Sequence, residues 1–150
     1  MDYELKRNQF SKVKNITWED IIDKINFEFS LGEVIAKIIN DDNLTPPSLM
    51  LPTPYYPKSI GVAYEEVCFE NQNQMHMHLY TSFASDSNTF GRHNDDDDVL
   101  IVQSIGSMSY SFDDGCKVTL FPGDSLFIRR EVYHNPIVLE PRATLSFSWS

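Results

Sequence analysis

The sequence of 150 residues carries a formal net charge of −10 and only two cysteines, Cys68 and Cys116. A chain of this length fits one domain and buries roughly 68–70% of its unfolded surface, so it can form a core without disulfide bonds. The cysteines form no C-x-x-C pattern, no apolar run approaches the ~20 residues of a membrane span, and no Lys/Arg cluster offsets the negative charge. We therefore expect a cytoplasmic protein without signal peptide or membrane partner, and nucleic acid is disfavoured as a ligand.

Two helix starts are predicted near the N-terminus. Thr17 is followed by an acid at Asp20, and the next apolar residues recur at helical spacing, which is typical of a capped amphipathic helix. A second start at Ser30 precedes an apolar stripe from Val34 to Ile39. Both stripes favour helices that dock onto a sheet.

Residues 44–58 hold five prolines and are predicted to form an extended connector, because proline removes backbone donors and cannot continue a helix. After it the chain becomes rich in short branched or aromatic runs. Eight strands are predicted, in residues 60–70, 74–83, 99–105, 107–112, 116–121, 124–130, 132–139 and 143–149. So many short strands favour a β-barrel or jelly roll. The turns at Asp113-Asp114-Gly115 and Pro122-Gly123 agree with this interpretation.

His93 and Asp95 stand two residues apart, and in an extended segment such residues point to the same side. His134 follows after enough chain for about four strands, so a coiled barrel can bring its strand beside the first. Two histidines and one carboxylate on neighbouring strands form a facial triad with three open coordination positions, as in non-haem Fe(II) oxygenases. The same spacing also occurs by chance without any metal.

A second same-face pair, His76 and His78, lies opposite Met75, Met77 and Leu79 and is predicted to be an exposed polar strand face, with a cupin metal site that uses both histidines as the alternative. The run Asp95–Asp98 is predicted to be a solvated segment in which Asp95 alone has ligand spacing. Cys68 and Cys116 are predicted to be small buried apolar residues.

The stretch from Thr89 to Gly106 resembles the H-x-D-x-x-D-V segment of JmjC-like and cupin-type oxygenases. Residues 122–134, which contain Pro122-Gly123-Asp124 and end at His134, are similar to the second conserved segment of that superfamily. The resemblance covers roughly residues 89–150. It implies a mainly β, double-stranded β-helix (cupin) fold, with Fe(II) held by His93, Asp95 and His134 and with 2-oxoglutarate as co-substrate.

One position departs from that resemblance, because Met108 stands where many of these proteins have a lysine that pairs with the far carboxylate of 2-oxoglutarate. Arg142, Thr144 and Ser146 lie on one face of the last strand and are similar to the co-substrate strand of prolyl-hydroxylase-like oxygenases. If this face lines the barrel, the planar guanidinium fork suits a carboxylate; otherwise the strand is simply half solvated.

The domain prediction is one cupin-like domain over residues 1–150, with a helical preamble in 1–43, a connector in 44–58 and the barrel in 59–150. The leading functional prediction is an Fe(II)- and 2-oxoglutarate-dependent oxygenase acting on a small molecule or a protein side chain, with a homodimer as a possible assembly. Two alternatives stay open. One is a metal-binding cupin that acts as an isomerase or cofactor-independent dioxygenase, and the other is a non-catalytic cupin binding module.

Overall fold

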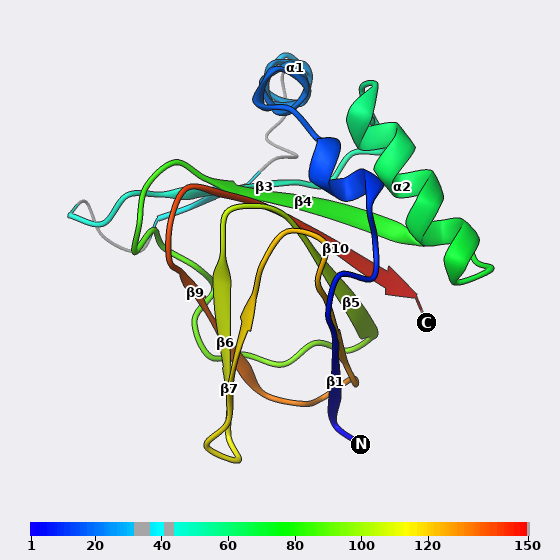
Figure 1. Ribbon diagram of the computed structural model, residues 1–150. Helices are drawn as coiled ribbons and strands as arrows, with labels where there is room; N and C mark the ends of the chain where they lie inside the picture. Colours follow the sequence, from blue (N-terminus) through cyan, green and yellow to red (C-terminus); the bar gives the residue numbers. More distant parts are fainter. Residues whose placement is uncertain (32–36, 41–43, 150) are drawn as a thin grey trace.

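Two antiparallel sheets face each other across the interior of a barrel, and two helices cover the outer face of the larger sheet (Figure 1). The computed structural model describes residues 1–31, 37–40 and 44–149. In chain order the elements are β1 (Tyr3–Lys6), a 3-10 turn (Lys12–Asn15), α1 (Trp18–Phe29), β2 (Lys37–Ile39), β3 (Ser48–Leu51), α2 (Ser59–Glu70), β4 (His76–Ser82), β5 (Asp98–Ile105), β6 (Met108–Phe112), β7 (Lys117–Leu120), β8 (Ser125–Ile128), β9 (His134–Val138) and β10 (Arg142–Trp149). This is the mainly β, double-stranded β-helix architecture that the sequence predicts.

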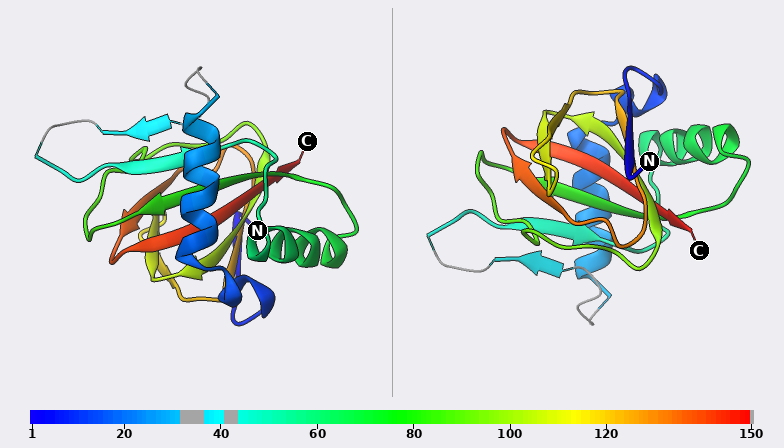
Figure 2. Two further views of the ribbon diagram at one scale, coloured as in Figure 1. Left: turned by 90° about the horizontal axis from the view of Figure 1, so that it is seen from above. Right: turned by 90° about the horizontal axis from the view of Figure 1, so that it is seen from below.

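The larger sheet has seven strands in the order β1-β8-β5-β10-β4-β3-β2, and the smaller has three in the order β7-β6-β9. Strand β10 lies at the centre of the larger sheet, paired with β4 on one side and β5 on the other. Seen from above, α1 crosses the strands of this sheet (Figure 2). None of the helices in the described residues is long and apolar enough to cross a membrane.

The larger sheet divides the core into two layers, because successive side chains of a strand point to opposite faces. Leu145 and Phe147 of β10 are fully buried on the helix side, together with Leu79 of β4 and Ile60 of α2. The other layer lies inside the barrel, where residues such as Ile101, Met108 and Leu126 pack together. The even-numbered residues of β10, from Arg142 onward, therefore face the barrel interior.

The first helix begins where the sequence predicts it. The Thr17 hydroxyl accepts a hydrogen bond from the Asp20 backbone N–H at 3.2 Å, and this caps the amino end of α1. Inside the helix, Lys24 and Glu28 form a fully buried ion pair with 2.6 Å between Lys24 Nζ and Glu28 Oε2. Lys24 also donates to the backbone carbonyls of Thr53 and Tyr55, so α1 is tied to the segment after β3. Burial lowers the pKa of Lys24, while the contact with Glu28 raises it.

The prediction of a strand in residues 60–70 is wrong, because Ser59–Glu70 forms α2. Its branched and aromatic composition suggested a strand, but the buried residues Ile60, Ala63 and Val67 recur at helical spacing and dock on the sheet. The second predicted helix is wrong at its end, where Lys37–Ile39 forms β2. Pairing with β3 overrides the local helical pattern there. Its middle, residues 32–36, lies outside the described residues.

The other seven predicted strands are present as β4 to β10. Three of the observed strands were not predicted. Strands β1 and β2 lie in residues 1–43, which were predicted to be a helical preamble, and β3 lies in the predicted connector, residues 44–58. In β3 the chain fits a four-residue strand between Pro47 and Pro52, neither of which needs to donate to the ladder. Of the cysteines, Cys68 is buried as expected, whereas Cys116 is exposed in the turn between β6 and β7.

A tight turn at Gly106 joins β5 to β6 and packs against the residue before Arg142. Gly106 has a φ of +70°, and a Cβ built there would lie 2.2 Å from the Pro141 carbonyl oxygen. We expect Gly106→Ala to lower the free energy of unfolding by more than the about 1–3 kcal/mol of a strained backbone, because the clash adds to it. Urea unfolding checks this. Gly115→Ala is the matched control, since its φ is +89° but nothing lies within 4 Å of the added Cβ. Equal losses in both variants would show that the contact with Pro141 has no effect.

Candidate metal centre and binding pocket

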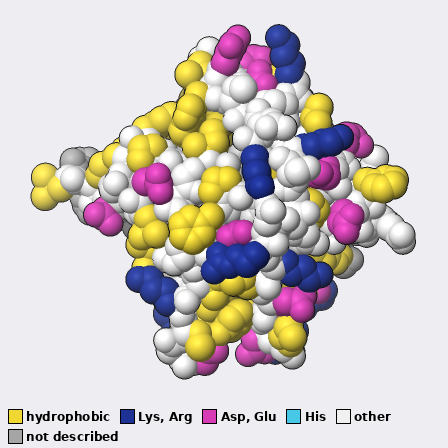
Figure 3. Space-filling model, in the orientation of Figure 1, with side chains coloured by type: hydrophobic (Ala, Val, Ile, Leu, Met, Phe, Trp, Pro, Cys, Tyr) yellow, Lys and Arg dark blue, Asp and Glu magenta, His cyan; other side chains and the backbone are white. Residues whose placement is uncertain are grey.

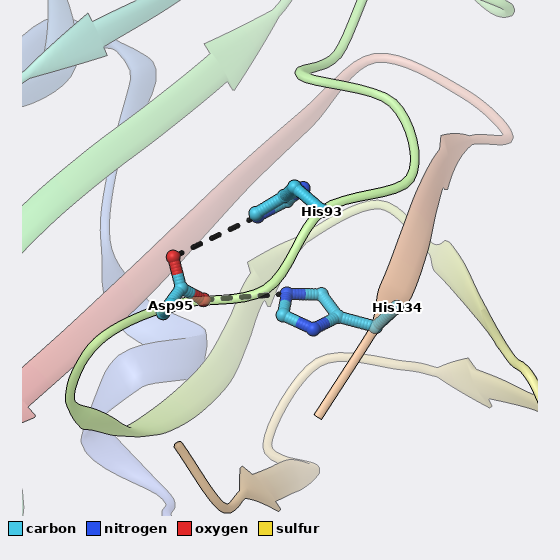
Figure 4. Close-up of side chains that lie close together, drawn as sticks. All are labelled: His93, Asp95 and His134. Carbon is cyan, nitrogen blue, oxygen red and sulfur yellow. Dashed lines mark ion pairs between the residues drawn. The ribbon is translucent and has the colours of Figure 1, made fainter. Parts of the chain in front are cut away.

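The three predicted ligand residues converge, although only His134 lies in a regular strand. Asp95 Oδ1 is 3.8 Å from His93 Nε2, and Asp95 Oδ2 is 3.5 Å from His134 Nε2 (Figure 4). One ligand atom from each residue lies within 4.8 Å of the other two, and this is the one such group found among the described residues. In a facial set, bonds of about 2.0–2.2 Å that meet at about 90° place the ligand atoms of one ion about 3 Å apart. The distances of 3.8 and 3.5 Å from Asp95 to the two histidines would therefore have to shorten by less than about 1 Å to hold a divalent ion.

Backbone hydrogen bonds hold the two ligand segments together. His93 N donates to His134 O at 2.9 Å and His134 N donates to His93 O at 2.8 Å, which forms an isolated antiparallel bridge. Glu131 N donates to the Asp95 carbonyl at 2.8 Å, so Asp95 is tied to the turn between β8 and β9. Four strands, β5 to β8, separate Asp95 from His134 along the chain, and the coiling of the barrel brings the ends together.

The imidazole rings are oriented by backbone carbonyls. His93 Nδ1 lies 2.7 Å from Gly91 O, and His134 Nδ1 lies 2.9 Å from Val132 O. A carbonyl only accepts, so we assign the proton of each neutral ring to Nδ1. Each Nε2 is then left with a lone pair facing Asp95, which is the arrangement of a metal-ligating histidine.

Burial lowers the pKa of His134, reinforced by nearby His93 and opposed by the Val132 carbonyl and Asp95. A lowered pKa keeps the ring neutral to lower pH. Because a metal binds the neutral ring, this shift keeps His134 available as a ligand below the usual titration range of histidine.

A pocket of about 320 Å³ opens beside His93, Asp95 and His134. Its walls come from both sheets and from the loop before β5. The lining residues are Ile39, His78, Tyr80, Thr89, Phe90, His93, Asp95, Asp96, Asp97, Val99, Ile101, Tyr110, His134, Pro136, Arg142, Thr144, Ser146 and Ser148. The predicted co-substrate residues on β10 thus face the same pocket as the predicted metal ligands.

Arg142 is the buried cation of this pocket, with 3% of its surface exposed. Its Nε donates to Ser82 Oγ at 2.9 Å, and its Cζ lies 5.7 Å from the centre of the Tyr80 ring. No carboxylate in the described part of the chain forms an ion pair with it. Burial lowers the pKa of Arg142, but arginine titrates so high that the side chain keeps its charge. An unpaired buried guanidinium is costly, so the pocket favours an anion.

The other two predicted co-substrate residues differ in how they are engaged. Thr144 is buried and its hydroxyl donates to Gln103 Oε1 at 2.9 Å, so that proton is not available to a ligand in this arrangement. Ser146 is half-buried on the pocket wall. Met108, at the position of the superfamily lysine, is fully buried in the barrel core and does not line the pocket.

Of the other candidates from the sequence, some line the pocket and some do not. His76 is exposed as predicted, whereas His78 is half-buried and lines the pocket wall beside Ser146. Asp96 and Asp97 line the mouth, while Asp98 begins β5 and accepts from the Arg130 backbone N–H at 2.8 Å. Sequence reasoning missed Tyr80 and Tyr110 as pocket residues. The alternation of β4 could have found Tyr80, because it shares a face with His78.

No protein-family model matches the chain, and no curated protein matches it in sequence. Solved structures from Escherichia coli match its fold. The ycfD structure superposes with a TM-score of 0.74 at 17% identity, over 99% of this chain and 49% of that one. The ribosomal oxygenase YcfD in complex with cobalt and succinic acid gives a TM-score of 0.73 at 14% identity, over 99% and 48%. Its complex with cobalt and 2-oxoglutarate gives 0.70 at 14%, over 99% and 48%.

The chain thus spans about half the length of the YcfD structures it matches. At such low identity the likeness concerns the fold. The chain therefore has the double-stranded β-helix fold that its sequence motifs predicted, and it shares this fold with the YcfD structures.

Proposed function

We propose that this protein is an oxygenase that uses Fe(II) and 2-oxoglutarate to oxidise a small molecule or a protein side chain. The observation that carries the proposal is the joint presence, in one pocket, of a two-histidine, one-carboxylate cluster and a buried guanidinium without an anionic partner. A dicarboxylic 2-oxo acid satisfies both, since one end can chelate a metal while the other pairs with Arg142.

The residues fit such a metal in number and chemistry. His93, Asp95 and His134 would hold the ion on one side and leave three positions for ligands, which is the coordination expected of non-haem Fe(II). When bound, the ion would supply the redox chemistry of oxygen activation. The chain itself holds the rings through Gly91 and Val132 and neutralises the far carboxylate with Arg142.

The comparisons support the same proposal, because two of the YcfD structures are complexes with cobalt and either succinic acid or 2-oxoglutarate. The two free cysteines and the need for ferrous iron fit a reducing compartment, so we propose a cytoplasmic location. Nucleic acid is an unfavourable partner for a net charge of −10. On the face in Figure 3 the basic side chains are interspersed with acidic ones and form no continuous patch. A homodimer stays a proposal as well.

The function is tested with protein purified without oxygen and loaded with Fe(II). We expect near-stoichiometric iron, saturable binding of 2-oxoglutarate and, on admitting oxygen, formation of succinate. Zinc-loaded protein is the control, because it should bind 2-oxoglutarate but form no succinate. Iron binding without any binding of 2-oxoglutarate would reject the oxygenase and leave the metal-binding cupin alternative.

A further inference from the structure

On the outer side of the barrel, Arg92 stacks on Tyr133 directly behind the two histidines of the candidate metal centre. The Arg92 guanidinium carbon lies 4.0 Å from the centre of the Tyr133 ring. Arg92 precedes His93, and Tyr133 precedes His134. Successive residues of an extended segment point to opposite sides. The histidines line the pocket, while Arg92 and Tyr133 are exposed and do not line it, so the stacked pair faces outward.

Arg92 and Tyr133 each stand in the middle of a three-residue unit that orients an imidazole ring. In both units the histidine Nδ1 lies 2.7 or 2.9 Å from the backbone carbonyl oxygen two residues earlier. The direction of each ring therefore depends on the course of the backbone through the middle residue. The two units meet in the isolated bridge between His93 and His134, and a bridge of one residue pair fixes the angle between two segments weakly. The Arg92–Tyr133 contact adds a second point of attachment.

Asp113, in the turn after β6, fixes the guanidinium over the ring. Its carboxylate accepts from Arg92 Nε at 3.0 Å and from Arg92 Nη2 at 2.6 Å. Two parallel hydrogen bonds of this kind set the plane of a guanidinium as well as its position. The preceding residue, Phe112, pairs in register with His134. Asp113 thus belongs to the strand that supports one histidine, while Arg92 belongs to the segment that carries the other.

We propose that Arg92 is a positioning residue for the metal centre, an inference that rests on the metal site of the proposed function. By stacking on Tyr133 and pairing with Asp113, it holds the two histidine segments in the alignment that a metal ion needs. Without this contact the ion would have to align the segments itself, and such ordering reduces affinity. A contact that only stabilised the fold would contribute equally with and without metal, and its loss would leave metal affinity unchanged.

The experiment measures the affinity for cobalt by competition with a chelator. For Arg92→Gln we expect about 3- to 10-fold weaker binding, the size of an exposed cation–π contact together with an exposed ion pair. Loss of a nearby positive charge would by itself favour a bound cation, so electrostatics alone predicts the opposite sign. Tyr133→Leu should lose as much as Arg92→Gln, whereas Tyr133→Phe keeps the ring and the wild-type affinity. The variant with both Arg92→Gln and Tyr133→Leu should lose no more than either alone, and additive losses would overturn the proposal.

Arg129→Gln is the matched control, because it removes the same charge from another exposed ion pair. The side chains of Arg129 and its partner Asp2 are 57% and 58% exposed, against 55% and 56% for Arg92 and Asp113. The control should keep the wild-type affinity for cobalt, and a loss equal to that of Arg92→Gln would overturn the proposal. A wild type that binds no cobalt would overturn the metal site and this inference together. A wild type that binds cobalt, with Arg92→Gln equal to it, would overturn the inference alone.

Discussion

Replacing His93, Asp95 or His134 with alanine is expected to abolish tight binding of a divalent metal ion. A three-residue site has no spare protein ligand, so each loss should exceed the about 10–100-fold effect of removing an outer-shell partner. The effect should be largest for His134, which is 3% exposed and lies at the buried side of the cluster. Metal content after dialysis, together with competition against a chromogenic chelator, measures it.

His76→Ala and His78→Ala are the matched controls for the ligand variants. His76 is exposed and His78 lines the pocket wall, but neither belongs to the ligand cluster. Both variants should keep wild-type metal occupancy. Wild-type occupancy in all three ligand variants would reject the site, and loss in the His76 or His78 variants would move the metal to β4.

Arg142→Ala is expected to weaken binding of 2-oxoglutarate to the iron-loaded protein while leaving metal binding intact. Removing one partner of a buried, hydrogen-bonded charge pair costs about 2–5 kcal/mol, which corresponds to about one and a half to four decades at ~1.4 kcal/mol per decade. Anaerobic calorimetric titration gives the affinity, and iron analysis gives the occupancy. Equal affinity in wild type and variant would remove Arg142 from the co-substrate site.

Arg142→Lys separates charge from shape. The ammonium group retains the positive charge but cannot present the planar two-donor fork, so only part of the affinity should return. Full recovery would mean that the Arg142 site recognises charge alone. The variant also loses the Nε donor to Ser82 Oγ, so its melting temperature must be compared with that of Arg142→Ala.

The candidate ligand set could be proposed from the sequence because its chemistry is local. His93 and Asp95 are two residues apart, and the strands between them and His134 are short enough to recognise. His93 and Asp95 do not lie in a continuous strand, which the same-side argument from an extended segment does not show. Their convergence comes from the isolated bridge between His93 and His134, and such a long-range backbone contact has no local signature in the sequence.

The pocket walls were predictable on one sheet and not on the other. Alternation along β10 placed Arg142, Thr144 and Ser146 on one face, and the burial of Leu145 and Phe147 on the other side settles which face is inside. Tyr110 reaches the pocket because β6 lies across the barrel from β10, and single-strand patterns do not show which strands face each other. Helix α2 has a branched and aromatic composition that is typical of a strand, and only the spacing of its buried residues indicates a helix.

Strand β10 lies at the centre of the larger sheet, with one face on the helices and one on the pocket. Its pairing register therefore decides which side chains line the pocket. A slip of one residue against β4 or β5 would turn Arg142 into the apolar layer under α2 and bring Leu145 and Phe147 into the pocket. Such a misfolded state would bury the Arg142 guanidinium among apolar side chains. The pocket would then contain no cation to bind an anion. The buried Arg142 guanidinium thus also disfavours the wrong strand alignment, because only the correct alignment gives it the Ser82 hydroxyl and an opening to the pocket.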